Sequence, residues 1–245
     1  MQENLGFFPD RKIAYFPSFP VYHGITTKLA GDYGYADLER EERQSRLLTA
    51  EIGADIYHKL QAQHGARVEW LDGQKQNQAG NYWPADGLLL PFPNIPRPPR
   101  VALMANTADC PIVFLADQRN RFIGLLHCGW KPLRQNIIAN ALAILYYQGI
   151  KRAGDIIAAI WPGICPACYK VRSEFNDYFP GQVQNGRISL NMVICQALNR
   201  LGVKNFFTLK DTFFCSAHST ENGDFQFFSH RRDQAPDRNT CFISF

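Results

Sequence analysis

Residues 107–130 read TADCPIVFLADQRNRFIGLLHCGW, two apolar runs joined by a polar turn. Short apolar runs bounded by turn residues are typical of buried strands. Cys110 precedes the first run and His127 closes the second. Because neighbouring strands bring such positions close in space, we expect the thiol and the imidazole to meet. The pair suits either a nucleophile with its base or two ligands of a soft metal.

The rest of the chain mixes strand and helix patterns without a strict alternation, which predicts one compact α/β domain over residues 1–245. We predict helices at 37–52, 132–148 and 189–200, and strands at 57–63, 66–71, 87–90, 101–106, 111–116, 122–127, 156–161, 205–209 and 225–229. Residues 72–83 are polar and predict a surface loop. Residues 91–99 are punctuated by proline and predict an irregular connection.

Composition narrows the functional classes. Of 245 residues, 46% are hydrophobic and 20% charged, as in an ordinary globular protein. The net charge of +4 comes without a basic tail, so we expect no nucleic-acid partner, although an anionic small substrate fits. We expect no secretory signal and no apolar run of membrane-spanning length. The seven cysteines are scattered, so we expect reduced thiols in a cytoplasmic protein, of undetermined oligomeric state.

His64 is a third candidate ligand, because it too follows an expected strand and precedes a glycine. Two imidazoles and one thiolate leave a fourth position open, as in catalytic zinc sites. The alternative is structural: buried cysteines often pack as small apolar side chains, and core histidines satisfy hydrogen bonds.

Cys165 and Cys168 form a C-x-x-C motif, which is found in redox dithiols and in halves of zinc sites. No second C-x-x-C exists in the chain. We therefore interpret the motif as a turn after the strand that ends at Trp161. His218 lies in a polar segment with no evident partner, and His23 and His58 are interpreted as structural or solvent-facing.

Residues 227–233, FFSHRRD, place Arg231 and Arg232 directly after an expected strand. Surface arginines are usually solvated, but a guanidinium pair can also bind phosphate or carboxylate. We keep both interpretations at this point.

Several motifs together resemble the YfiH/laccase-domain family, also described as multicopper polyphenol oxidase-like and associated with purine nucleoside phosphorylase activity. The motifs are TADCPIVFLAD, GLLHCGWKPLRQNII, WPGICPACYKV and FFSHRRD, with HGARV and PADGLLL weaker. The resemblance implies a single-domain layered α/β sandwich with a mixed sheet and flanking helices. It also implies zinc ligands at His64, Cys110 and His127.

The resemblance further implies phosphorolysis of purine nucleosides and methylthioadenosine, and deamination of adenosine. Purine nucleoside and phosphate would be the partners. The chain departs from the family pattern near the site: Lys28 and Lys131 stand where arginines are usual, and Pro132 replaces a glycine. The metal ligands are retained while these neighbours differ.

Our leading hypothesis is therefore zinc-assisted attack of phosphate or water on a purine nucleoside. Zinc lowers the pKa of bound water to about 7, which would supply the nucleophile for deamination. Arg231 and Arg232 would hold phosphate, with Lys28 and Lys131 as further substrate-binding residues. Asp109 or Asp86 would orient a ligand histidine or protonate the leaving purine.

Three alternatives remain open. A copper-dependent polyphenol oxidase is the first, and copper bound in vitro would prove little because it outcompetes zinc for such ligands. Efficient multicopper chemistry also needs more histidine ligands than the six present readily supply. The second is a metal-free hydrolase in which His127 activates Cys110. The third is a partner-binding protein with a vestigial site.

Overall fold

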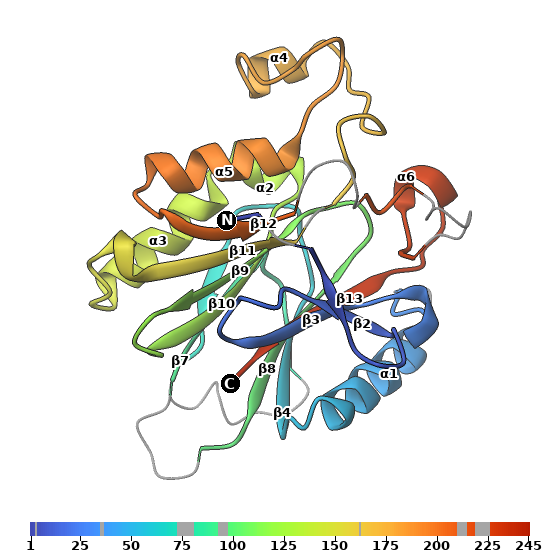
Figure 1. The fold of residues 1–245 in the computed structure, drawn as a ribbon, viewed down its shortest axis with the longest axis vertical. Helices are drawn as coiled ribbons and strands as arrows, with labels where there is room; N and C mark the ends of the chain where they lie inside the picture. Colours follow the sequence, from blue (N-terminus) through green and yellow to red (C-terminus); the bar gives the residue numbers. More distant parts are fainter. Residues whose placement is uncertain are drawn as a thin grey trace.

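The computed structural model describes residues 1–2, 4–34, 37–72, 81–92, 98–161, 163–209, 215–218 and 226–245. Two mixed sheets pack face to face (Figure 1). One sheet has the order β12 (Asn205–Thr208), β11 (Ile156–Trp161), β9 (Ile112–Asp117), β10 (Phe122–His127), β7 (Gly87–Pro91), β5 (Val68–Trp70). The other has the order β1 (Gly6–Phe7), β2 (Ile13–Tyr15), β3 (Tyr22–Thr26), β13 (Asn239–Ser244), β8 (Val101–Thr107), β4 (Ile56–Leu60), β6 (Asn81–Trp83).

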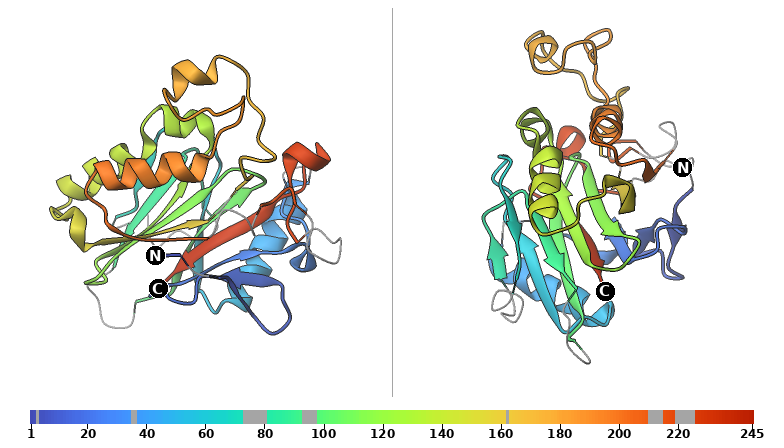
Figure 2. Two further views of the ribbon diagram at one scale, coloured as in Figure 1. Left: turned by 45° about the horizontal axis from the view of Figure 1, so that its top comes forward. Right: turned by 90° about the vertical axis from the view of Figure 1, so that its left-hand side faces the viewer.

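Helices flank the two sheets (Figure 1). They are α1 (Leu38–Glu51), α2 (Trp130–Arg134), α3 (Ile137–Tyr147), α4 (Phe175–Tyr178), α5 (Leu190–Arg200) and α6 (His230–Asp233), with the 3-10 turns η1 (Lys28–Ala30) and η3 (Ala153–Asp155). Figures 1 and 2 show α3 and α5 on one side of the molecule and α1 on the other. The predicted α/β class with flanking helices is confirmed.

Strand β9 shows why its residues are apolar throughout. Val113 and Leu115 pack with the helix layer of α3 and α5. Ile112 and Phe114 face the opposite way, into the core between the two sheets. Successive side chains of a strand point to opposite faces, so a strand buried on both faces needs an unbroken apolar run.

Several element predictions need correction. The helix expected over 132–148 is two helices, because Asn136 adopts φ 61° between α2 and α3, and asparagine tolerates this left-handed conformation. The strand expected over 225–229 is wrong where it is described: residues 226–229 are irregular and lead into α6. The loop expected over 72–83 ends in strand β6. Its residues 73–80, like 93–97 of the proline-rich connection and residue 225, lie outside the described residues.

Strands β1, β2, β3 and β13 were not predicted. β13 occupies the middle of its sheet, antiparallel to both β3 and β8. Its first residues are polar and buried: Asn239 and Thr240 hydrogen-bond to neighbouring chain segments, including Asn106. These satisfied polar side chains interrupt the apolar pattern by which a buried strand is recognised.

Several strand ends of the six-stranded sheet meet at one edge. His127 and Trp161 both pair with Ile112, so β10 and β11 end where β9 begins. Gly87 pairs with Leu126, which brings the start of β7 to the same edge. The residues that follow or precede these ends are therefore close in space.

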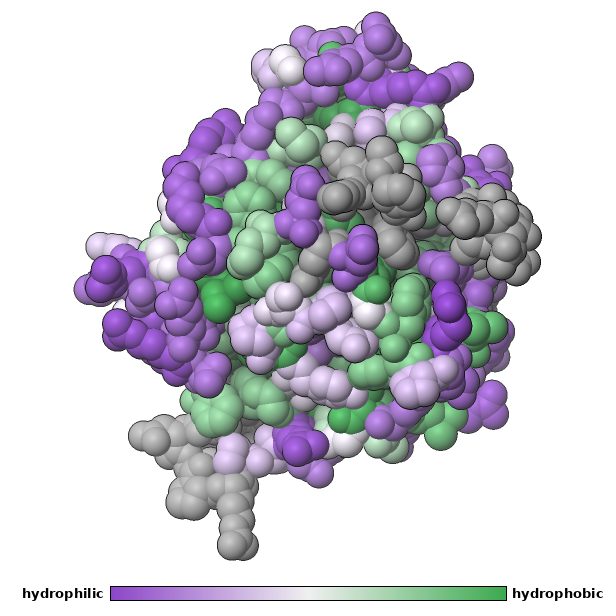
Figure 3. All heavy atoms as spheres, in the orientation of Figure 1, coloured by the Kyte–Doolittle hydropathy of each residue, from purple (hydrophilic) through white to green (hydrophobic). Residues whose placement is uncertain are grey.

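The described helices include none with both the length and the apolar character needed to cross a bilayer. Hydrophilic residues cover the outer side of α3 and the protruding region of α4, as Figure 3 shows.

Candidate metal and substrate site

His64 and Cys110 each approach His127 at this edge, and the three residues belong to separate segments. The imidazole rings of His64 and His127 lie with centroids 5.2 Å apart and planes at 86°. Gly129 faces both Cys110 and His127. A Cβ added to this glycine would lie 3.0 Å from Cys110 Sγ and 3.6 Å from His127 Nε2. The sulfur and the Nε2 edge therefore face the same small space, which only a residue without a side chain leaves open.

Asp86 anchors two of these three residues through one buried carboxylate. Its Oδ1 lies 3.0 Å from His127 Nδ1 and accepts the backbone N–H of His64 at 3.0 Å. Its Oδ2 accepts the N–H of Gly65 at 2.8 Å. The carboxylate thus holds Nδ1 as the protonated nitrogen and leaves Nε2 of His127 for a ligand.

The charges of the site shift the pKa of each imidazole differently. Burial alone would lower the pKa of His127, but negative charge on Cys110 and the Asp86 carboxylate raise it to about 9. Burial and the positive charge of His127 lower the pKa of His64. Burial would raise the pKa of Asp86, and its hydrogen bonds from His127 and the backbone outweigh this and lower it. A cation between the three side chains would relieve these competing charges.

The donor set fits a metal ion. One thiolate and two imidazoles match the ligands of catalytic zinc, and the carboxylate behind His127 matches the outer partner such ligands usually have. The same set also accepts copper.

Asp109 lies beside Cys110 but does not contact the imidazoles in the described structure. Its backbone has φ 81°, and its Oδ1 accepts Ser216 Oγ–H at 2.5 Å. Its Oδ2 accepts the N–H of Arg231 at 2.6 Å. Of the two carboxylates considered in the sequence, it is thus Asp86 that bonds a candidate ligand.

The two arginines of FFSHRRD have different surroundings. The guanidinium of Arg231 lies 5.1 Å from the ring of Tyr169 and donates to Lys170 O. Burial, and then negative charge on Cys110, raises the pKa of Tyr169 to about 12. The backbone N–H of Arg231 bonds to Asp109, the neighbour of Cys110. Arg231 therefore borders the site.

Arg232 instead holds the chain together. Its guanidinium donates to Ser216 O at 2.9 Å and to Phe227 O at 3.0 Å, and it pairs with Asp233. Lys28 lies 3.9 Å from the same Asp233 and over the Phe228 ring. Both side chains are thus engaged around α6 rather than directed at the imidazoles.

Lys131 is exposed at the start of α2, with Nζ 5.6 Å from the Trp130 ring centroid. Its charge contributes to the lowered pKa of His64, as does that of Arg238, which the sequence analysis did not single out. These two cations lie on the His64 side of the site.

The sequence interpretation of Cys165-Pro-Ala-Cys168 as a simple turn is incomplete. Cys165, Cys168, Cys215 and His218 place their ligand atoms all within 4.8 Å of one another. The second half of the group is a C-x-x-H in place of a second C-x-x-C, and His218 therefore has partners.

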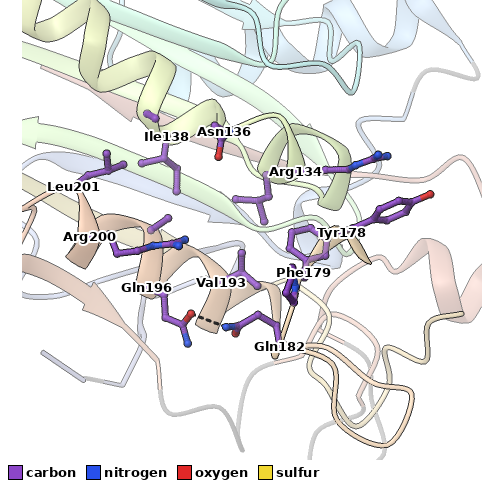
Figure 4. A pocket seen from close by; sticks show the side chains of 14 residues that line it. Arg134, Asn136, Ile138, Tyr178, Phe179, Gln182, Val193, Gln196, Arg200 and Leu201 are labelled. Carbon is purple, nitrogen blue, oxygen red and sulfur yellow. Dashed lines mark hydrogen bonds between the residues drawn. The ribbon is translucent and has the colours of Figure 1, made fainter. Parts of the chain in front are cut away.

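A separate cavity of about 330 Å³ opens between α3, α5 and the region of α4 (Figure 4). Gln182 and Gln196 hydrogen-bond across it at 2.7 Å, and Arg134 and Arg200 line it. The described residues of its wall include no thiol, imidazole or carboxylate, so its size does not make it the chemical centre.

Comparison with known proteins identifies the family of the chain. The family model described as "Multi-copper polyphenol oxidoreductase laccase" matches residues 30–244. A purine nucleoside phosphorylase of Deinococcus radiodurans is 31% identical over 171 residues, 64% of this chain and 62% of that protein. One of Aquifex aeolicus is 29% identical over 143 residues, 56% of this chain and 63% of that protein. The matches thus span less than two thirds of these relatives.

The crystal structure of YlmD from Geobacillus stearothermophilus superposes with a TM-score of 0.78, covering 95% of this chain and 96% of that one at 22% identity. At that identity the likeness establishes the fold. The chain belongs to the multi-copper polyphenol oxidoreductase laccase family, the YfiH type. Several of the relatives that it matches are named purine nucleoside phosphorylase.

Proposed function

We propose that this protein is a zinc-dependent purine nucleoside phosphorylase whose metal is held by His64, Cys110 and His127. The observation that carries the proposal is the convergence of Cys110 Sγ and the Nε2 edge of His127 over Gly129, with Asp86 on Nδ1. The relatives' names supply the reaction class.

In the proposed reaction, the bond from ribose C1′ to the purine nitrogen breaks and a bond from C1′ to a phosphate oxygen forms. When bound, zinc would act as a Lewis acid that stabilises developing negative charge. The chain itself must bind the phosphate, orient the nucleoside and exclude water.

Arg231 is our candidate for binding phosphate, with Lys131 as a second cation. The N–H bond from Arg231 to Asp109 fixes the start of α6, and the guanidinium rests near the Tyr169 ring. A guanidinium binds a phosphate through two parallel hydrogen bonds, which fixes its orientation. Lys131, across the site near His64, would add a point charge.

Asp109 acts here as a positioning residue. Both of its oxygens accept hydrogen bonds, which suits an ionised carboxylate rather than a proton donor. It sits next to Cys110 and fixes Arg231, so it would set the distance between the metal and the phosphate. Arg232 and Lys28 would support α6 rather than contact substrate.

We also propose adenosine and methylthioadenosine as further substrates, with water replacing phosphate as the nucleophile in adenosine deamination. The lowered pKa of His64 supports the metal that such a water would need, because it leaves the imidazole neutral and available as a ligand. Copper-dependent phenol oxidation is the competing function for the same ligands.

Two organisational proposals accompany the function. We infer one domain over residues 1–245, because the central core draws on both sheets and on segments from Ala14 to Ile243. We infer a cytoplasmic location, because all seven cysteines are outside disulfides.

The decisive experiment measures purine release from inosine, adenosine and methylthioadenosine with and without phosphate. The wild type is compared with His127→Ala, Cys110→Ser and the control Cys195→Ser, which alters a partly buried thiol on α5. Phosphate-dependent release should be retained in the control and lost in both ligand variants. Equal activity in wild type and His127→Ala, or none in either, contradicts the proposal.

Metal analysis separates the competing functions. Protein purified without added copper should contain zinc, and its activity should fall with a chelator and return with zinc. Alkylation of Cys110 should become faster after chelation if a metal protects the thiolate. Alkylation that chelation leaves unchanged would support the metal-free cysteine hydrolase instead.

A further inference from the structure

Four metal-binding side chains converge at a place apart from the His64, Cys110 and His127 group. They are Cys165, Cys168, Cys215 and His218, whose ligand atoms all lie within 4.8 Å of one another. Cys165 Sγ lies 4.0 Å from His218 Nδ1. In a tetrahedral zinc site with bonds of about 2.3 Å to sulfur, ligand atoms are about 3.8 Å apart, so a small contraction brings these atoms to that geometry.

We propose that Cys165, Cys168, Cys215 and His218 form a second, structural zinc site of the Cys3His type. The site closes around the ion with four protein ligands and leaves no open position, as structural rather than catalytic zinc sites do. It shares no ligand with the first site, and its occupancy does not depend on the proposed phosphorylase activity.

The backbone around these residues has the form that such ligands require. Cys168 N–H donates to Cys165 O at 3.0 Å, and His218 N–H donates to Cys215 O at 3.2 Å. Each pair therefore lies on a tight turn that points both ligands the same way. Spacings of two residues between ligands are usual in structural zinc sites.

Two N–H groups point at the sulfur of Cys215. Cys165 N–H lies 3.2 Å from this sulfur and Ala217 N–H lies 3.3 Å from it. These two contacts fix the sulfur between the two turns, where it faces the other ligands.

Arg187 supplies a compensating charge. Its guanidinium donates to the carbonyl oxygens of Pro166 and Ala167, the two residues between Cys165 and Cys168. Three thiolates and one neutral imidazole around Zn²⁺ carry one net negative charge, and a neighbouring guanidinium offsets it. The arginine also fixes the turn that holds the first two ligands.

A disulfide accounts for the arrangement less well. It would join two sulfurs and leave the third thiol and the imidazole without a reason to converge. His218 is exposed, yet its Nδ1 faces Cys165. Four donors of the types that zinc prefers indicate an ion at their centre.

The proposed ion would join two segments that both contact Asp109. Ile164 N–H donates to Asp109 O at 2.9 Å, and Ser216 Oγ–H donates to its carboxylate. A cavity of about 10 Å³ between the groups is lined by Cys110, Gly163 and Cys215, among others. The second zinc would therefore hold the wall against which Cys110 and Asp109 rest.

The test is zinc stoichiometry of the full-length protein, purified in the presence of a reductant and measured by atomic emission. We expect two zinc ions per chain in the wild type and in Cys195→Ser. One should remain in Cys168→Ser or His218→Ala, and one in His127→Ala. Wild-type zinc content unchanged by Cys168→Ser and His218→Ala would overturn the proposal.

X-ray absorption of zinc-loaded His127→Ala provides a readout that does not require altering the second site. With the first site removed, the remaining zinc should show three sulfur ligands at about 2.3 Å and one nitrogen. A single sulfur ligand, or a Cys165–Cys215 disulfide found by mass spectrometry in the reduced preparation, would refute the assignment.

Discussion

The carboxylate of Asp86 lies 3.0 Å from Nδ1 of His127 and is completely buried. The same oxygen accepts the backbone N–H of His64, so one side chain sets the position of two candidate ligands, one on β10 and one in the loop between β4 and β5. The strand pairing of Leu126 with Gly87 brings this carboxylate to the end of β10. The geometry of the site therefore depends on the register of a sheet.

Replacing Asp86 with asparagine should weaken metal binding about 10- to 100-fold, the usual effect of removing an outer carboxylate behind a ligand histidine. The introduced amide would have to present its N–H₂ group toward N–H donors of the 63–65 segment or toward His127. Competition with a chromophoric chelator measures the change. Asp55→Asn is the control. Asp55 also accepts a backbone N–H, that of Arg100, but it lies just before β4, at the end of that strand away from the site. Equal zinc affinity in Asp86→Asn and wild type would disprove the role.

Adding a methyl group at Gly129 should disturb the first metal site without unfolding the protein. The new Cβ would lie 3.0 Å from Cys110 Sγ, so the sulfur must move by a few tenths of an ångström. We expect lower zinc affinity and a matching loss of activity in Gly129→Ala. In Gly154→Ala, where nothing lies within 4 Å of the added atom, both should stay at wild-type values. An unaltered affinity in Gly129→Ala would contradict the close approach.

His23 should make the fold sensitive to acid. Its Nε2 accepts the N–H of Phe16 at 2.9 Å and its Nδ1 donates to Val21 O, so the buried ring has no place for a second proton. Burial lowers its pKa to about 4. The unfolded chain binds this proton near pH 6.5, so stability is complete above that pH and falls between pH 6.5 and 4 by about 3 kcal/mol.

Urea unfolding at pH 7 and pH 4 measures this effect. His23→Gln, whose carbonyl can still accept from Phe16, should start less stable but lose less between the two pH values. Identical losses in the variant and the wild type would exclude His23 as the source.

Removing only one partner of the Lys59–Glu41 ion pair should strongly destabilise the fold. Lys59 Nζ lies 2.6 Å from Glu41 Oε1, and both side chains are buried between α1 and β4. Lys59→Met or Glu41→Leu alone should lower the free energy of unfolding by about 3 to 5 kcal/mol, because each leaves a buried charge unpaired. The double variant should recover most of that loss. Simple addition of the two single effects would contradict the coupling.

The strands that the sequence predicts well are those buried on both faces. β10 and β11 have the predicted bounds because each is an uninterrupted apolar run. β1 and β2 are only two and three residues long and are defined by pairing with each other. In β13, the polar side chain of Thr240 finds its hydrogen-bond partner, Asn106, on the neighbouring strand β8. The break at Asn136 likewise depends on a left-handed residue that local periodicity does not reveal.

For the site, the sequence identified the side chains but not their partners. His64, Cys110 and His127 stand out because each follows or precedes an apolar run, and such positions meet at sheet edges. The choice between Asp86 and Asp109 required the strand register. The pairing of Cys165 with Cys215 joins residues 50 positions apart, and no local pattern predicts that distance.

The position of β13 has a consequence for how the molecule forms. It follows every other strand in the chain, yet it lies between β3 and β8 and hydrogen-bonds to both. During synthesis, β1, β2 and β3 therefore have no edge to join until the last strand has left the ribosome. Contacts between such distant positions are slow to form, since a long loop must close first. The N-terminal strands lack this sheet neighbour until then, and we expect nascent chains to need protection from aggregation at that stage.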